Sequence, residues 1–140
     1  MIEPVLNVPD VDAAVRFYTD QLGFTSGSTL PGPDGKAVFG TVLWGQAMLM
    51  FQLEQPSAAQ SPRGAHFELY LGVPEDQDID ALYADLQAKG ITVTLPIKDE
   101  YWGARTFQIE DLNGFRLRFG KTVREMSVEE VAEYTLGGGN

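Results

Sequence analysis

The sequence predicts an α+β protein made of two tandem βαβββ units, whose curved mixed sheets surround a concave trough and carry their helices on the outer face. Three observations predict this class. An alternating strand pattern followed by a helix pattern opens the chain. The same order returns about 65 residues later, as an internal duplication would produce. A polar segment rich in Pro, Ser and Ala, residues 55–64, separates the two patterns and is typical of a linker.

The first unit begins with a strand over Ile2–Val8, in which Glu3 and Asn7 share one face. A helix is predicted over Val11–Leu22, because apolar residues recur there at helical spacing after Asp10, a typical N-cap. Further strands are expected over Phe24–Leu30, Ala37–Trp44 and Gln46–Glu54.

The second unit repeats this order. Its first strand is predicted over His66–Val73, with His66, Glu68 and Tyr70 on one face, and a helix follows from about Asp78. The remaining strands are expected over Ile91–Leu95, Arg105–Glu110 and Phe115–Gly120.

These patterns divide the chain into a first unit over 1–54, a linker over 55–64, a second unit over 65–121 and a C-terminal extension over 122–140. Within the extension, Ser127 and Glu130 have the spacing of a capping box, so a short helix is expected to start there.

Composition excludes several classes of function. The 140 residues include no Cys, so a disulfide scaffold, a thiol nucleophile and a thiolate zinc site are excluded. The net charge of −10 would repel a phosphate backbone, so no nucleic-acid partner is expected, and it favours encounter with cationic small molecules. No apolar run is long enough to span a membrane, and no leader-like pattern opens the chain. A cytoplasmic location is the expectation.

Two segments carry a resemblance to a known family. Residues 4–24, PVLNVPDVDAAVRFYTDQLGF, closely resemble the opening of the glyoxalase/bleomycin-resistance/dioxygenase superfamily, also called vicinal oxygen chelate proteins. Residues 102–119, WGARTFQIEDLNGFRLRF, are similar to that family's closing Trp-Gly…Phe…Asp-Pro-x-Gly-Asn…Phe pattern, with Leu112 in place of the usual Pro and Phe115 in place of the usual Asn. The resemblance implies the duplicated βαβββ fold but leaves the activity open, because the family includes isomerases, dioxygenases, transferases and antibiotic binders.

The resemblance also implies where a divalent metal would be held in an enzymatic member. The four ligand positions fall on Glu3, Met50, Glu68 and Arg118. Met50 is a poor ligand for hard cations, and a guanidinium, which stays protonated, is none. We therefore expect Arg118 to replace the cation and to pair with Glu68 or Glu3. In a shifted alignment His66 would become a ligand, although a lone His on a strand is more often an ordinary hydrogen-bonded residue.

The resemblance and the composition lead to one main hypothesis, a dimeric, cofactor-free protein of the bleomycin-resistance type that sequesters a small aromatic or cationic molecule. Its dimer is expected to form through sheet edges, with the N-terminal strand a candidate for exchange. Trp102 is the first candidate for stacking on the ligand, although it can equally pack under its turn. The other candidate ligand-binding residues are Glu3, Asn7, Met50, His66, Glu68, Tyr70 and Arg118.

Two enzymatic alternatives stay open. One is a metal-dependent lyase, isomerase or dioxygenase that holds a divalent cation with Glu3, His66 and Glu68. The other is a metal-free enzyme that uses Glu68 and Arg118 as base and electrophile. The sequence assigns no catalytic residue with the spacing of a known nucleophile motif.

Overall fold

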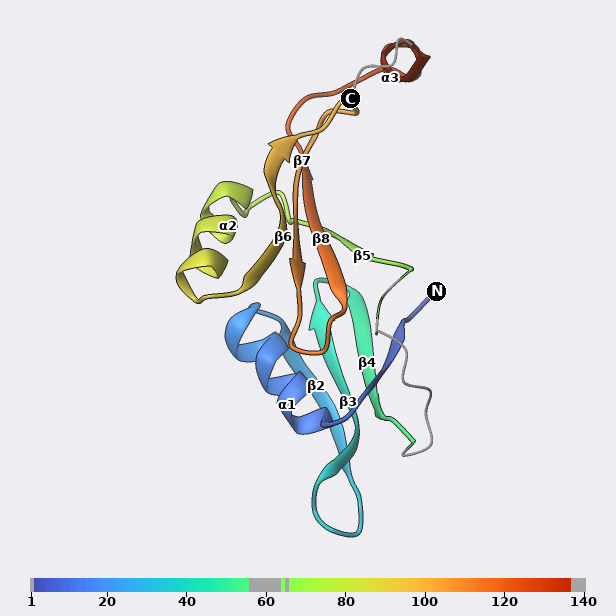
Figure 1. The fold of residues 1–140 in the computed structure, drawn as a ribbon, viewed down its shortest axis with the longest axis vertical. Coiled ribbons are helices and arrows are strands. Elements are labelled where there is room, and N and C mark those ends of the chain that lie inside the picture. Colours follow the sequence, from blue (N-terminus) through green and yellow to red (C-terminus); the bar gives the residue numbers. More distant parts are fainter. Residues whose placement is uncertain (1, 56–63, 65, 137–140) are drawn as a thin grey trace. The chain divides into compact units, whose positions relative to one another are not determined.

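The computed structural model describes residues 2–55, 64 and 66–136 (Figure 1). The chain folds into two compact units, one formed by Met1–Ala65 with Leu112–Gly114 and the other by His66–Asp111 with Phe115–Asn140. Each unit contains one four-stranded mixed sheet. The predicted α+β class with two βαβββ units is therefore confirmed.

The first unit has the order β1 (Val5–Val8), α1 (Val11–Arg16), η1 (Phe17–Gln21), β2 (Thr25–Pro31), β3 (Ala37–Trp44) and β4 (Ala47–Leu53). Its sheet has the strand order β1-β4-β3-β2, and β1 runs parallel to β4. The helix lies across one face of this sheet (Figure 1). Asp10 caps it as predicted, since its carboxylate accepts a hydrogen bond of 2.9 Å from the amide of Ala13.

An aromatic cluster forms the core of the first unit. Tyr18 is fully buried, and its ring centroid lies 5.1 Å from that of Phe24 and 4.9 Å from that of Phe51. Leu6 and Val8 of β1 are buried toward the helix, so Val5 and Asn7 occupy the opposite, helix-free face.

Most strand ends in the first unit lie within one residue of the prediction, and two larger differences remain. The first strand begins at Val5 rather than Ile2; Pro4 precedes it and has no N–H to donate to a ladder. The predicted helix over Val11–Leu22 changes to a π-helical turn at Phe17. The hydroxyl of Thr19 donates to the carbonyl of Val15 at 2.9 Å, and such a bond within a helix competes with the regular backbone ladder.

The second unit contains β5 (Leu69–Gly72), α2 (Ile79–Ala88), β6 (Thr92–Asp99), β7 (Ala104–Glu110), β8 (Arg116–Thr122) and α3 (Val128–Leu136). Its strand order is β5-β8-β7-β6, with β5 parallel to β8. Asp78 caps α2 through a 2.8 Å bond from the amide of Asp80. Between α2 and the sheet, the ring of Phe107 stacks on Phe119 at 5.2 Å and meets Tyr83 at 5.0 Å.

Two strands of the second unit differ from the prediction by three residues or more at one end. The first is shorter than His66–Val73, because its ladder with β8 begins only at Leu69, which pairs with Leu117. His66 therefore lies in a turn before the strand, and its predicted place on a strand face with Glu68 is wrong. Strand β6 is longer than Ile91–Leu95, since an edge strand tolerates Pro96 and the ladder with β7 continues past it through a register shift.

The C-terminal extension contains the predicted helix. The amide of Ser127 donates to the Glu130 carboxylate at 3.2 Å, and the amide of Glu130 donates to the Ser127 hydroxyl at 3.1 Å, which is the expected capping box. The predicted linker lies outside the described residues over 56–63, and its role as a boundary stays a prediction. Within the described part of the chain, no helix is long and apolar enough to cross a membrane.

Arg105 ties the start of α2 to the hairpin of β6 and β7. Its guanidinium donates to Asp99 at 2.6 Å and 3.2 Å and to Asp80 at 2.9 Å. These hydrogen bonds from Arg105 lower the pKa of Asp99 below its ordinary 3.8, and the same bonds raise the pKa of Arg105.

Replacing Asp99 by asparagine is expected to remove a small, pH-dependent contribution to stability. A carboxyl whose pKa is lowered by folding stabilises the protein above its unfolded pKa, and the contribution disappears as the pH falls through the folded value. The urea midpoints of wild type and Asp99→Asn are therefore expected to differ at about pH 5–7 and to converge below about pH 3. Asp76→Asn, at an exposed carboxylate outside these bonds, is the control; an equal pH dependence there would contradict the prediction.

Candidate functional site

The helix-free face of the second sheet carries polar side chains that strand alternation brings together. On β7, Phe107 and Ile109 point toward α2 and are fully buried, so Thr106 and Gln108 point to the opposite face. On β8, Leu117 and Phe119 pack toward α2 in the same way, which leaves Arg118 beside them on the polar face.

A chain of hydrogen bonds runs across this face from β6 to the start of β5. The hydroxyl of Thr94 donates to the amide oxygen of Gln108 at 2.8 Å, and the amide nitrogen of Gln108 donates to one oxygen of Glu68. The other oxygen of Glu68 accepts a bond of 2.9 Å from Nε of Arg118. Both oxygens of this carboxylate are therefore engaged, and the predicted pairing of Arg118 with Glu68 is confirmed.

A second, more deeply buried carboxylate completes the arrangement. The Glu100 side chain is only 8% exposed, and it accepts a hydrogen bond of 2.8 Å from the hydroxyl of Thr106. Nη1 of Arg118 lies 3.6 Å from the same Glu100 oxygen and 3.4 Å from the Thr106 hydroxyl. We call Glu68, Glu100, Thr106, Gln108 and Arg118 the guanidinium cluster.

The charges of this face balance. The guanidinium cluster contains two carboxylates and one guanidinium, and Nζ of Lys98 lies 3.6 Å from the second carboxylate oxygen of Glu100. Two negative groups thus meet two positive groups. The face is locally neutral although the whole chain carries a net charge of −10.

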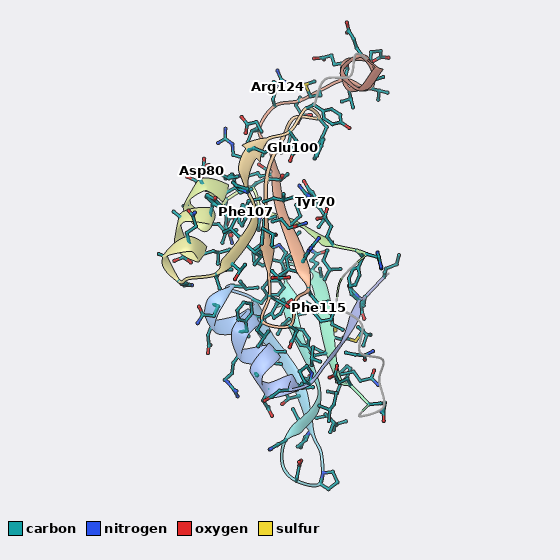
Figure 2. The ribbon with its side chains drawn as sticks, viewed as in Figure 1. Tyr70, Asp80, Glu100, Phe107, Phe115 and Arg124 are labelled. Atoms are coloured by element: carbon teal, nitrogen blue, oxygen red, sulfur yellow. The ribbon has the colours of Figure 1, made fainter. Side chains whose placement is uncertain are left out.

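An exposed aromatic ring lies next to the cluster. Tyr70 on β5 is the register partner of Arg118 on β8, so the two side chains leave neighbouring strands on the same face. Tyr70 is 54% exposed. Figure 2 shows Tyr70 on the side of the sheet away from α2, whereas Phe107 points toward that helix.

The comparison with protein families agrees with the fold. The model of the Glyoxalase/Bleomycin resistance protein/Dioxygenase superfamily matches residues 2–119. The chain belongs to this superfamily. The resemblance read from residues 4–24 and 102–119 is thereby confirmed.

Individual relatives place this superfamily member among proteins of similar size. The uncharacterized protein Rv0887c of Mycobacterium tuberculosis is 26% identical over 137 residues, which cover 93% of this chain and 79% of that one. TnmS3 from Streptomyces, described as an antibiotic binding protein, is 25% identical with a TM-score of 0.67, covering 86% of this chain and 93% of that chain. TioX from Micromonospora shares the fold, with a TM-score of 0.68 at 23% identity over 86% of this chain and 97% of that chain.

Membership of the superfamily raises the question of a divalent metal, and the donor set does not fit one. Both carboxylate oxygens of Glu68 already accept hydrogen bonds, one from Gln108 and one from Arg118. The guanidinium of Arg118 has no lone pair that it could donate to a metal. Across residues 2–55, 64 and 66–136, no three His, Asp or Glu side chains lie together in a way that could hold a metal ion. The alternative set stays a prediction, because Glu3 belongs to the first unit and His66 and Glu68 belong to the second.

The candidates in the first unit lie on or beside an apolar face. Met50 on β4 is half-buried, and its amide donates to the carbonyl of Pro4 at 3.0 Å, just before β1. Glu3 and Asn7 are exposed, and Asn7 pairs in register with Gln52. The alternative pairing of Arg118 with Glu3 stays a prediction, because the two residues belong to different units.

Trp102 lies in the turn between β6 and β7. It is 39% exposed, and its ring meets Tyr101 edge to face at 5.0 Å. Gly103 follows with a φ of +95°, and its carbonyl accepts hydrogen bonds from the amides of Val123 and Arg124, which fixes the turn against the end of β8. No hydrogen bond, ion pair or ring contact joins Trp102 to the guanidinium cluster within the described ranges.

The sequence reasoning missed three members of the guanidinium cluster. Thr106 and Gln108 could have been predicted, because alternation along the strand Arg105–Glu110 places them on the face opposite Phe107 and Ile109. Glu100 could not be predicted in this way, because a carboxylate next to a turn belongs to no sequence pattern that indicates burial. Its burial depends on the return of β7 and β8 beside that turn.

Proposed function

We propose that this protein is a metal-independent binder that sequesters a small aromatic or cationic molecule, in the manner of the antibiotic-resistance members of its superfamily. The observation that carries the proposal is the guanidinium of Arg118, held 2.9 Å from Glu68 beside the exposed ring of Tyr70. The protein's own cation occupies the place that the resemblance marks for a metal ligand. The face offers a stacking surface and hydrogen bonds, which are what a binding site needs.

Two further observations support the proposal. TnmS3, whose structure aligns over 86% of this chain, is described as an antibiotic binding protein. The net charge of −10 raises the local concentration of cationic molecules near the surface. Acidic charge acts on encounter at long range, whereas the aromatic ring and the cluster act on the bound ligand.

The proposal includes a homodimer in the cytoplasm. Strands β1 and β2 are the edges of the first sheet and β5 and β6 those of the second, and an edge strand presents unpaired backbone groups to a second copy. Strand β1 pairs with β4 of its own chain, so removing residues 1–8 tests whether this edge holds the dimer.

The test is a fluorescence titration of the full chain with three planar probes of different charge. Proflavine is a cationic acridine, acridone is a neutral one, and anilinonaphthalene sulfonate is an anion. Saturable binding of proflavine or acridone is expected at about micromolar Kd, with one site per chain, whereas the anion is expected to bind more weakly. Light scattering on the same samples, with and without residues 1–8, measures the dimer.

A metal analysis provides the opposing outcome. Protein purified without chelator is analysed for transition metals, together with Glu68→Ala. Near-stoichiometric metal that disappears in the variant would overturn the binder in favour of a metal-dependent lyase, isomerase or dioxygenase. Absence of saturable binding for all three probes would also defeat the proposal.

A further inference from the structure

A side chain at Gly120 on β8 would collide with Tyr70 on the polar face of the second sheet. A Cβ at Gly120 would fall on the hydroxyl end of the Tyr70 ring, and it would lie 3.1 Å from Cε1 of that ring. At Gly72, the register partner of Gly120 on β5, a Cβ would meet nothing within 4 Å. The two glycines are neighbours in the same sheet, yet only one of them makes room for the ring.

The position of the Tyr70 ring depends on this space. Gly120 pairs with Gly72 on one side and with Thr106 on the other, so the end of the ring reaches across β8 toward the guanidinium cluster. The hydroxyl end is held against the backbone, and 54% of the residue stays exposed. An aromatic ring that is seated at one end and open elsewhere is a stacking surface.

Arg118 supplies a hydrogen-bond donor next to that surface. Its Nε is used by Glu68, and its Nη1 faces Thr106 and Glu100. Among the described residues, Nη2 donates no hydrogen bond. The side chain is 17% exposed, so a ligand can reach it, and an unpaired guanidinium N–H favours an acceptor such as a carbonyl oxygen.

The charge balance of the face decides between neutral and charged ligands. Glu68 and Glu100 are offset by Arg118 and Lys98, so a cationic ligand finds no uncompensated carboxylate within the cluster. A cation would also be brought close to a guanidinium, which is unfavourable. A neutral ring loses no hydration of a charge when it stacks on Tyr70.

We infer that this face selects a neutral, planar aromatic molecule with a hydrogen-bond acceptor at its edge, which stacks on Tyr70 and accepts from Arg118, and that Gly120 is the residue that positions Tyr70. The inference rests on the proposed binding function and narrows its ligand class. Gly120 touches no ligand itself and acts through the ring that it accommodates.

The experiment compares Gly120→Ala with Gly72→Ala in the fluorescence titration. Acridone carries a carbonyl acceptor at the edge of a neutral ring, and proflavine is its cationic counterpart. Wild type is expected to bind acridone more tightly than proflavine, and Gly120→Ala is expected to weaken acridone binding about tenfold, because its methyl group displaces the ring. Gly72→Ala is expected to stay within about twofold of wild type.

Two further variants separate a positioning effect from damage to the fold. Tyr70→Leu removes the ring and is expected to lose as much affinity as Gly120→Ala, whereas the double variant is expected to lose no more than either alone. Tyr70→Phe keeps the ring and is expected to bind acridone within about threefold of wild type.

Fluorenone and fluorene, which differ by the carbonyl group, test whether the ligand needs a hydrogen-bond acceptor. Wild type is expected to bind fluorenone about tenfold more tightly than fluorene.

The outcomes distinguish this inference from the proposed function. Binding of acridone that is unaffected by Gly120→Ala would overturn the role of Gly120 and leave the binder in place. Preference for proflavine over acridone would overturn the neutral ligand class alone. Failure of wild type to bind any probe would overturn the proposed function and the inference with it.

Discussion

Replacing Arg118 by methionine is expected to lower the free energy of unfolding by about 2–4 kcal/mol at neutral pH. The substitution keeps the length of the side chain but removes the guanidinium from between Glu68 and Glu100. Glu100 is the costly partner, because its side chain is 8% exposed and it keeps only the Thr106 hydroxyl and the more distant Lys98. A carboxylate left buried without its cation destabilises a fold more than the pair stabilised it.

A matched substitution on the same strand isolates the effect of the cluster. Arg116 lies two residues before Arg118 and is exposed, so Arg116→Met is expected to change stability by no more than about 0.5 kcal/mol. Adding Glu100→Gln to Arg118→Met is expected to recover about 1 kcal/mol or more, because the stranded charge is removed while the amide oxygen still accepts from Thr106. Urea denaturation measures all four proteins. Equal stability of the Arg118 and Arg116 variants would show that the cluster contributes nothing.

Replacing Phe107 by alanine is expected to cost about 3–5 kcal/mol, which is a large part of the stability of a domain of this size. Phe107 is fully buried, and its ring stacks on Phe119 and meets Tyr83 of α2. Its removal leaves a cavity between the helix and the sheet that two rigid aromatic neighbours cannot fill. Phe67→Ala is the control, since Phe67 is 47% exposed and its ring centroid lies 6.1 Å from that of Phe115. This variant is expected to lower the free energy of unfolding by about 1 kcal/mol or less.

The measurement can report on the second unit alone. The chain has two tryptophans, Trp44 in the first unit and Trp102 in the second. In a Trp44→Phe background, fluorescence therefore follows only the unit that contains Phe107. A shift in that transition of the size seen for Phe67→Ala would contradict the assignment of Phe107 to the core.

Most of the fold could be predicted because it depends on local patterns. The caps at Asp10 and Ser127 are set by residues within one turn, and both form as expected. The helix predicted to begin at about Asp78 does so, and Asp78 caps it. Strand β3 has the predicted bounds. The errors lie where a partner decides the boundary, as at His66, which the ladder with β8 does not reach.

The candidate site could be predicted only in part, for a related reason. Arg118 and Glu68 were paired from charge and ligand chemistry, and the structure contains that pair. Trp102 was the first candidate for stacking on a ligand, whereas the aromatic ring next to the guanidinium cluster is that of Tyr70. A residue's type shows what it can bind, but its neighbours across a sheet depend on register.

The sequence by itself determined the family, the duplicated βαβββ plan and the absence of thiol chemistry, because these follow from residue identity and from patterns of two or 3.6 residues. The tertiary structure decided that Glu100 is buried against Thr106 and Arg118, and that Tyr70 rests in the space left by Gly120. These contacts join residues from different strands. They exist only once the register of four strands is set, and no single segment of the chain encodes that register alone.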